Sequence, residues 1–234
     1  MVLNLVLAES ALETIPSELW RDPLIRRYSE KRGKEVEFLL LDRSYHHAAM
    51  KNLPWSEKRG RPDIVHFSLL EALGSPLNKE GLLRVYVHTI SNCIISINPE
   101  TRLPRNYDRF VGLFEQLFKL EQIPSNGPAL LTLVENTTLP KLVKKIKPDY
   151  TIAFSRTGDF KTLQECVSAF IDKKNPLVIV GGFQHGTLSS NSLKLANLVV
   201  AIDREMLETW TLTARIVYEY EKLLNLPIKR LITR

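Results

Sequence analysis

The chain has 234 residues, of which 44% are hydrophobic and 25% are charged, which is an ordinary globular composition with enough length for one large domain. No run approaches the roughly 20 apolar residues of a membrane span, the N-terminus lacks the basic region of a secretory signal, and Cys93 and Cys166 form no CxxC pair. We therefore expect a soluble cytoplasmic protein without a disulfide framework or a cysteine zinc site. The formal net charge of +6 favours a polyanionic partner, although many basic proteins bind no nucleic acid.

Short apolar runs rich in β-branched residues recur along the chain, as is typical of buried strands. They cover residues 2–8, 36–42, 82–90, 93–98, 129–135, 150–155, 176–182 and 197–203. Segments with helical spacing lie between most of them, and this alternation predicts an α/β fold with a largely parallel sheet. The turn at Ile90, Ser91 and Asn92 is the exception, because it is short enough to predict an antiparallel hairpin.

The last long segment repeats apolar residues at helical spacing, which predicts a helix with one buried face that ends before Pro227. These apolar residues are Leu207, Trp210, Ala214 and Val217, and the basic tail that follows contains Lys229, Arg230 and Arg234. Residues 42–60 and 99–105 are the main loop-like regions, and we expect function there because binding residues concentrate on loops. We see no internal repeat and expect a single domain over residues 1–234.

The stretch RGRPDI places Arg59, Arg61 and Asp63 where an apolar helix is predicted to begin. Pro62 suits the first helical position, and Asp63 in the first turn complements the helix dipole. The predicted apolar face contains Ile64, Phe67, Leu70 and Leu73. In one interpretation Asp63 starts the helix and pairs with Arg61 on the surface. In the other, Arg59 and Arg61 bind phosphates while Asp63 fixes one guanidinium by a bidentate salt bridge.

A second arginine cluster lies in RLPRNYDRF, where Arg102, Arg105 and Arg109 are spaced by three and four residues. If Arg105 and Arg109 are both helical, they share one face. Three arginines around a tyrosine, with one acid, form a plausible groove for single-stranded or looped RNA. A solvated helix start explains the same pattern.

The stretch PLVIVGGFQHG runs from a buried strand into a glycine-rich turn. Gly181, Gly182 and Gly186 allow close backbone approach to a ligand, but no Walker or GxGxxG motif is present, which disfavours a phosphate-binding nucleotide site. A loop that offers its backbone to an adenosine-like group and a plain tight turn both remain open.

The histidines predict neither a metal site nor a catalytic triad. His46 and His47 are adjacent and would point apart, and no HExxH or nucleophile elbow is present. We expect His66 and His88 to be packed and His185 to be exposed in the glycine turn.

Together, RPD, SPLNK, NPETRLPRNYDRF and VGGFQHG resemble, in order, the motifs of one family. It is the small-subunit ribosomal RNA pseudouridine (nitrogen-1) methyltransferases that also act in ribosome biogenesis, a branch of the SPOUT knotted methyltransferases, and the chain is most similar to archaeal members. The resemblance implies a SPOUT-type fold with a C-terminal trefoil knot, a homodimer, and S-adenosylmethionine-dependent methylation of a pseudouridine in a hairpin loop of small-subunit rRNA. It also implies RNA-binding insertions around residues 42–62 and 84–109 and a cofactor-binding knot region at about 129–226.

The resemblance assigns residues to each role. Arg59, Arg61, Arg102, Arg105 and Arg109 are implied to contact RNA, with Asp63 and Arg61 at the reacting base. The implied cofactor residues are Leu133, Val134, Gly181, Gly182, Gly186, Thr187, Leu188, Ile202, Asp203, Arg204, Glu205, Met206 and Leu207. The segment AIDREMLETW departs from the serine-asparagine-tyrosine-proline-like segment that relatives often carry.

Methyl transfer from a sulfonium depends mainly on positioning, so we expect Asp63 to orient Arg61. A helix start beside an arginine favours the charged carboxylate and makes it a poor base, so a base role for Asp63 is the lesser alternative. The rival functions are a non-catalytic rRNA-binding assembly factor and a transfer-RNA methyltransferase of the same fold.

Overall fold

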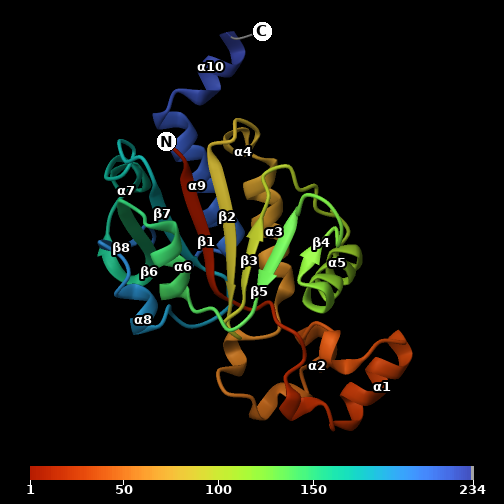
Figure 1. Cartoon of the computed structure of the whole chain (residues 1–234). Helices are drawn as coiled ribbons and strands as arrows, with labels where there is room; N and C mark the ends of the chain where they lie inside the picture. The colour runs from red at the N-terminus through yellow and green to blue at the C-terminus, as the bar shows by residue number, and fades with distance from the viewer. Residues whose placement is uncertain (233–234) are drawn as a thin grey trace.

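An eight-stranded, mainly parallel sheet forms the centre of the computed structural model, which describes residues 1–232 (Figure 1). The strands are β1 (Leu3–Ser10), β2 (Leu83–Thr89), β3 (Ile94–Ile97), β4 (Gln122–Ile123), β5 (Leu131–Val134), β6 (Tyr150–Phe160), β7 (Pro176–Gly181) and β8 (Leu198–Ala201). Their order is β4-β5-β3-β2-β1-β7-β6-β8. Strands β2, β1, β7, β6 and β8 are parallel, and β3, β5 and β4 extend the sheet in antiparallel fashion. The predicted α/β fold is therefore confirmed.

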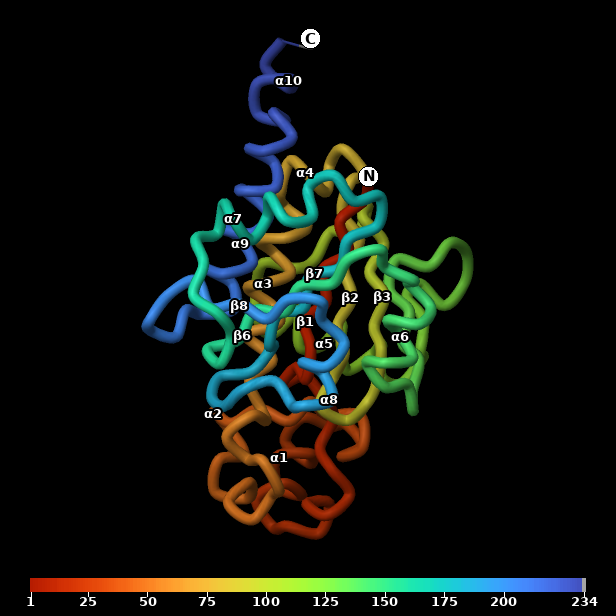
Figure 2. Tube along the Cα trace, turned by 90° about the vertical axis from the view of Figure 1, so that its left-hand side faces the viewer, coloured from red at the N-terminus to blue at the C-terminus, as the bar shows by residue number. Residues whose placement is uncertain are grey.

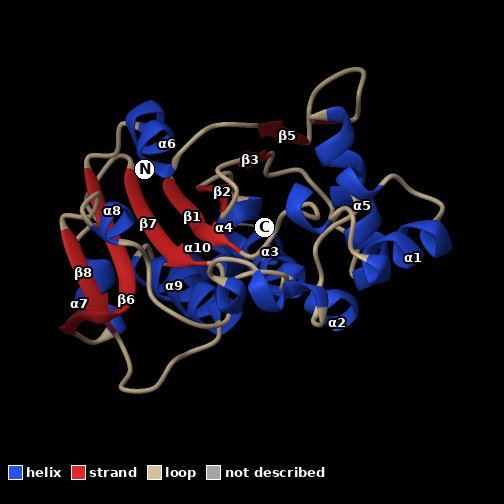
Figure 3. Cartoon of the chain, turned by 90° about the horizontal axis from the view of Figure 1, so that it is seen from below, coloured by secondary structure: helices blue, strands red, loops and turns tan. Residues whose placement is uncertain are grey.

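Helices cover both faces of the sheet (Figure 3). They are α1 (Pro23–Arg32), α2 (Arg43–His46), α3 (Pro62–Gly74), α4 (Pro76–Lys79), α5 (Tyr107–Leu120), α6 (Leu139–Ile146), α7 (Leu163–Ser168), α8 (Ser190–Leu193), α9 (Thr209–Leu223) and α10 (Leu226–Ile232). The larger core lies under α3, α5 and α9, and a smaller one lies under α6. Strand β1 serves both cores, because Leu5 and Leu7 face the first while Val6 and Ala8 face the second.

Residues 11–60 form a lobe below the carboxyl ends of the parallel strands (Figures 1 and 2). This lower lobe contains α1, α2 and the short 3-10 helices Ser17–Leu19, Val36–Phe38, Ala49–Asn52 and Ser56–Lys58. It has its own apolar cluster, which includes Ile15, Leu39, Leu41 and Met50. Ion pairs from Arg32 (3.0 Å) and Lys34 (2.5 Å) to the buried Glu115 fasten the lobe to α5.

The structure corrects the strand predicted at residues 36–42. Val36–Phe38 is a 3-10 helix, and Leu40 makes only an isolated antiparallel bridge to Thr14. Leu39 and Leu41 are buried in the lower lobe, so their apolar character reflects that cluster and not a place in the sheet. The antiparallel hairpin at Ile90–Asn92 is confirmed, because Val87 pairs with Ile95 across β2 and β3.

The predicted helices exist, but their buried faces differ from the prediction. Phe67 on α3 is 46% exposed, because α3 buries Val65 and Leu69 instead. On α9 the buried residues include Thr213 and Ile216, while Trp210 is half-buried at the edge against Phe67, with ring centroids 5.5 Å apart. Arg234 of the predicted basic tail lies outside the described residues.

Candidate functional site

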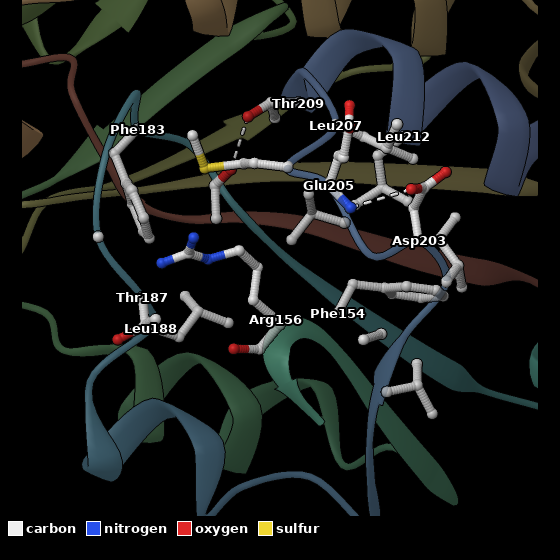
Figure 4. A pocket seen from close by; sticks show the side chains of 18 residues that line it. Phe154, Arg156, Phe183, Thr187, Leu188, Asp203, Glu205, Leu207, Thr209 and Leu212 are labelled. Carbon is white, nitrogen blue, oxygen red and sulfur yellow. Dashed lines mark hydrogen bonds between the residues drawn. The ribbon is translucent and has the colours of Figure 1, made fainter. Parts of the chain in front are cut away.

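A cavity of about 100 Å³ lies at the carboxyl ends of β6, β7 and β8, where α9 begins (Figure 4). This edge is where ligands bind in parallel α/β sheets. Its walls come mainly from three segments, namely the middle of β6, the loop after β7 and the loop between β8 and α9. Thr209 fixes the third segment to the second, since its Oγ1 donates to the Gly181 carbonyl at 2.9 Å.

Most residues predicted to bind the cofactor line this cavity. They are Gly181, Gly186, Thr187, Leu188, Ile202, Asp203, Glu205, Met206 and Leu207. Gly182 and Arg204 do not line it, and Gly182 instead packs against β1, where a Cβ atom would lie 2.1 Å from Ser10 Oγ. Gly186 has a φ of +101°, which requires glycine in this turn.

Leu133 and Val134 lie away from this cavity. They lie on β5, and β3, β2 and β1 separate that strand from β7. They therefore do not line this cavity, and their role in cofactor binding stays a prediction that this geometry does not favour. The strand that does contribute is β6, through Phe154, Ser155 and Arg156, which sequence reasoning missed. The signal was present in the chain order, because consecutive parallel strands tend to be neighbours and β6 directly precedes β7.

The cavity combines apolar walls with charges of both signs. Phe154, Phe183 and Leu188 supply apolar surface, and the Arg156 side chain extends toward Phe183 (Figure 4). Asp203 and Glu205 add carboxylates, and Asp203 Oδ1 accepts a hydrogen bond from the Glu205 amide at 3.0 Å. Such a site suits a ligand with a flat apolar part and both charges.

Arg61 and Asp63 form the predicted bidentate salt bridge at the start of α3. Arg61 Nε donates to Asp63 Oδ1 at 2.8 Å and Nη2 donates to Oδ2 at 2.7 Å, with side chains 24% and 27% exposed. The Asp63 hydrogen bonds raise the pKa of Arg61 against the effect of burial, and the charges of Glu208 and Asp42 add to the rise. Pro62 is the first residue of the helix, as predicted.

Arg59 has a different environment. Its Nε and Nη2 both donate to the carboxylate of Glu13, each at 2.7 Å. The Glu13 side chain is 2% exposed and that of Arg59 is 13% exposed. Arg59 therefore neutralises a buried acid, and its role as an RNA contact stays a prediction that this geometry does not favour.

Arg102, Arg105 and Arg109 are exposed, and within residues 1–232 their guanidinium groups have no hydrogen-bond or ion-pair partner. Arg105 is not helical, because Asn106 caps α5 by accepting the Arg109 amide at 3.0 Å. The condition for a shared helix face, that Arg105 and Arg109 are both helical, is therefore not met. The region 84–109 is also not a simple insertion, since β2 and β3 belong to the central sheet.

Two buried contacts fix the arginine-bearing loop. His66 Nε2 donates to the Pro104 carbonyl at 2.7 Å, and the His66 ring stacks on Phe110 with centroids 4.2 Å apart. Tyr107 donates to Asp42 Oδ2 at 2.5 Å. Burial, followed by the hydrogen bond to Asp42, raises the pKa of Tyr107, while burial lowers the pKa of His66. Both groups therefore stay neutral at pH 7.

His66 and His88 are buried and His185 is exposed, as predicted. Burial lowers the pKa of His46 to about 4, so this side chain is neutral at pH 7. Among residues 1–232, no group of three or more His, Cys, Asp or Glu side chains is arranged for a metal ion. No helix in the same range is long and apolar enough to cross a membrane.

The cavity lies near Arg61. Leu207 lines the cavity, and the adjacent Glu208 is close enough to Arg61 to raise the pKa of that guanidinium after the stronger effect of Asp63. The Phe67–Trp210 contact joins α3 to α9 one turn further on. A ligand in the cavity therefore lies beside the start of α3.

Residues 5–221 match the model of the EMG1/NEP1 methyltransferase family. The chain is 42% identical over 219 residues to the ribosomal RNA small subunit methyltransferase Nep1 of Pyrococcus furiosus, which covers 94% of this chain and 96% of that protein. It is 44% identical over 220 residues to Nep1 of Thermococcus sibiricus, covering 94% and 98%. The crystal structure of Archaeoglobus fulgidus Nep1 bound to S-adenosylhomocysteine is similar, with a TM-score of 0.84 and 36% identity over 96% of this chain and 100% of that one. The chain belongs to the EMG1/NEP1 methyltransferase family.

Proposed function

We propose that the protein transfers a methyl group from S-adenosylmethionine to small-subunit rRNA, at nitrogen-1 of a pseudouridine in a hairpin loop. The observation that carries this proposal is that the cavity, lined by Leu207, lies one residue along the chain from Glu208, whose charge acts on the Asp63-bound Arg61, in a member of a methyltransferase family. A cofactor in the cavity and an RNA on the arginine surface would meet at the start of α3.

The cavity residues fit S-adenosylmethionine. When bound, this cofactor supplies an electrophilic methyl group on a sulfonium. Phe154, Leu188 and the Gly186 turn offer an apolar slot for the adenine ring. Arg156 is suited to the cofactor carboxylate, and Asp203 or Glu205 to its ammonium or ribose hydroxyl groups. The relative of known structure binds S-adenosylhomocysteine, the product that remains after methyl transfer.

The RNA contacts follow from exposure and free charge. Arg102, Arg105 and Arg109 present guanidinium groups that are unpaired within residues 1–232, on the loop before α5 and the first turn of α5, which His66 and Tyr107 hold in place. Such groups bind phosphates in a defined register. Arg61 is held by Asp63 beside the cavity, so we place it at the reacting base.

The geometry favours orientation over base catalysis by Asp63. Both Asp63 oxygens already accept hydrogen bonds from Arg61, so neither is free to accept the proton of the reacting base. Nitrogen-1 of pseudouridine would give up its proton to solvent before it attacks the methyl group, which leaves a negative charge on the ring until the carbon–nitrogen bond forms and the carbon–sulfur bond breaks. We assign to Arg61 the stabilisation of the resulting negative charge on the ring.

This role of Asp63 is tested by Asp63→Asn. We expect rRNA affinity to fall modestly and the methylation rate to fall with no change in the shape of its pH profile, because orientation is lost and no titrating base is removed. A variant that keeps full RNA affinity and shows a shifted pH profile would restore Asp63 as the base.

We also propose a homodimer and a C-terminal trefoil knot. Large apolar side chains are exposed at Phe67 on α3, Met206 in the loop before α9 and Tyr218 on α9. These side chains support a dimer interface formed by α3 and α9. Cys93 and Cys166 are buried free thiols, which fits work in a reducing cytoplasm.

The test is methylation of purified small-subunit rRNA with radiolabelled S-adenosylmethionine, with transfer RNA as competitor. Incorporation into rRNA that transfer RNA does not suppress supports the proposal, and preferential labelling of transfer RNA supports the other methyltransferase. Tight rRNA binding without incorporation supports an assembly factor that only clamps RNA.

A further inference from the structure

The loop 183–188 forms one wall of the cofactor cavity and has few anchors of its own. Gly182 before it donates to the Ala8 carbonyl at 2.8 Å, and Ser189 after it donates to Glu9 Oε1 at 2.8 Å. Between these two points, one hydrogen bond reaches the loop from the described part of the chain. It is donated by Lys58 Nζ to the Thr187 carbonyl.

Lys58 lies across the whole loop. Its Nζ sits 4.3 Å from the centre of the Phe183 ring, as a cation–π contact requires. Its Cε is so close to the turn that a Cβ on Gly186 would lie 2.9 Å away. Phe183, Gly186 and Thr187 all line the cavity, so one lysine contacts three positions of its wall.

Glu9 holds the Lys58 ammonium in place. Glu9 is the next-to-last residue of β1 and has a φ of 51°, in the left-handed region, and its Oε2 accepts from Lys58 Nζ at 2.8 Å. Its Oε1 accepts from the Ser189 amide at 2.8 Å and from Ser192 Oγ at 2.7 Å. Burial raises the pKa of Glu9, but these hydrogen bonds outweigh it and the net pKa is lowered, so the carboxylate stays charged.

Lys58 does not belong to the cofactor half of the molecule. It ends the 3-10 helix Ser56–Lys58 of the lower lobe, three residues before Arg61. The connection is stiff, because Arg59 is clamped by Glu13 and the Arg61 amide donates to the Ala11 carbonyl at 3.2 Å. Lys58 and Arg61 therefore lie on one short segment that these contacts hold in place.

We propose that Lys58 is a positioning residue that orders the 183–188 loop for the cofactor and couples cofactor binding to RNA binding at Arg61. The proposal rests on the proposed function and adds a route of communication between its two ligands. Because such coupling is reciprocal, S-adenosylhomocysteine should tighten rRNA binding by the same factor by which rRNA tightens S-adenosylhomocysteine binding.

The test uses the full chain with Lys58→Met, which keeps an apolar stem and removes the ammonium, and Lys58→Arg as the conservative variant. Lys51→Met is the matched control, because Lys51 is an exposed lysine of the same lobe, in the neighbouring 3-10 helix. Calorimetry gives the Kd for S-adenosylhomocysteine, and fluorescence anisotropy gives the Kd for an rRNA hairpin with and without saturating S-adenosylhomocysteine.

We expect Lys58→Met to weaken S-adenosylhomocysteine binding roughly tenfold or more, as for loss of a hydrogen bond to a charged group. Its RNA affinity without cofactor should stay within about twofold of wild type, while the effect of cofactor on RNA affinity disappears. Lys58→Arg should recover part of both effects, and Lys51→Met should resemble wild type.

A folded Lys58→Met protein with wild-type S-adenosylhomocysteine affinity and coupling overturns the proposal. If that variant unfolds because Glu9 is left without a cation, Glu9→Gln/Lys58→Met removes both charges and is measured in the same way. A wild-type protein that binds neither S-adenosylhomocysteine nor the hairpin overturns the proposed function together with this inference. A wild-type protein that binds both, with unchanged variants, overturns the inference alone.

Discussion

Replacement of Arg59 by methionine is expected to destabilise the fold, although Arg59 lies two residues from the RNA-facing Arg61. The substitution removes both hydrogen bonds of 2.7 Å to Glu13 and leaves that carboxylate 2% exposed without a cation. Breaking a buried ion pair from one side costs about 3–5 kcal/mol of unfolding free energy. The matched change Arg61→Met breaks a pair about a quarter exposed, and we expect a cost of about 1 kcal/mol or less.

The loss in Arg59→Met should depend on pH. Burial raises the pKa of Glu13, and the hydrogen bonds from Arg59 oppose that rise, so the variant carboxyl should have a still higher pKa. A protonated carboxyl group needs no cation, which makes the variant comparable to wild type below the unfolded pKa of about 4.3. The deficit should then grow as pH rises from the folded pKa of Glu13 in the wild type to the higher folded pKa in the variant, because the unfolded pKa is common to both proteins.

Urea denaturation at several pH values measures this deficit, and hairpin binding by the folded fraction measures the RNA contribution. Glu13→Gln/Arg59→Met removes both charges and should recover part of the stability. An Arg59→Met protein that loses less than about 1 kcal/mol but as much RNA affinity as Arg61→Met would refute the reasoning, because Arg59 would then act on RNA.

Three further predictions concern the arginine loop, a buried histidine and the glycine turn. Filter binding measures how the RNA binding constant depends on salt concentration. Loss of one phosphate contact should reduce the slope of log binding constant against log salt by about 0.7 in each of the variants Arg102→Ala, Arg105→Ala and Arg109→Ala. Unchanged slopes would contradict the role of these arginines. Burial lowers the pKa of His46 to about 4, so the unfolding free energy should fall by about 3 kcal/mol as pH drops from 6.5 toward 4. In urea titrations, His46→Asn should reduce this dependence of the unfolding free energy on pH. Gly186→Ala should weaken S-adenosylmethionine binding about tenfold in calorimetry, since φ is +101° and the new Cβ meets Lys58, and wild-type affinity would mean that the turn adjusts freely.

The strand pattern and the helix starts could be predicted because each depends on residues close in sequence. Pro62 and Asp63 mark the start of α3 by local chemistry alone, and the short turn at Ser91 forces a hairpin. The strand predicted at residues 36–42 was wrong because apolar residues predict burial but not the cluster in which they are buried. Here Leu39 and Leu41 are buried in the cluster of the lower lobe.

The candidate site needed information that periodicity lacks. Leu133 and Phe154 both lie in short apolar runs of the sequence, and only the order of strands in the sheet decides which of them meets β7. Arg59 and Arg61 look alike in sequence. Only the structure shows that Arg59 forms a buried ion pair with Glu13, which is 46 residues away in the chain. Lys58 gave no signal at all, since its partners Glu9 and Thr187 are distant in the chain.

The most direct measurement is mass spectrometry of an rRNA hairpin after incubation with the protein and S-adenosylmethionine, with either pseudouridine or uridine at the target position. The proposed function predicts one added methyl group on the pseudouridine hairpin, located at nitrogen-1 by fragmentation, and none on the uridine hairpin. Equal methylation of both hairpins, or a bound but unmodified pseudouridine hairpin, would contradict it.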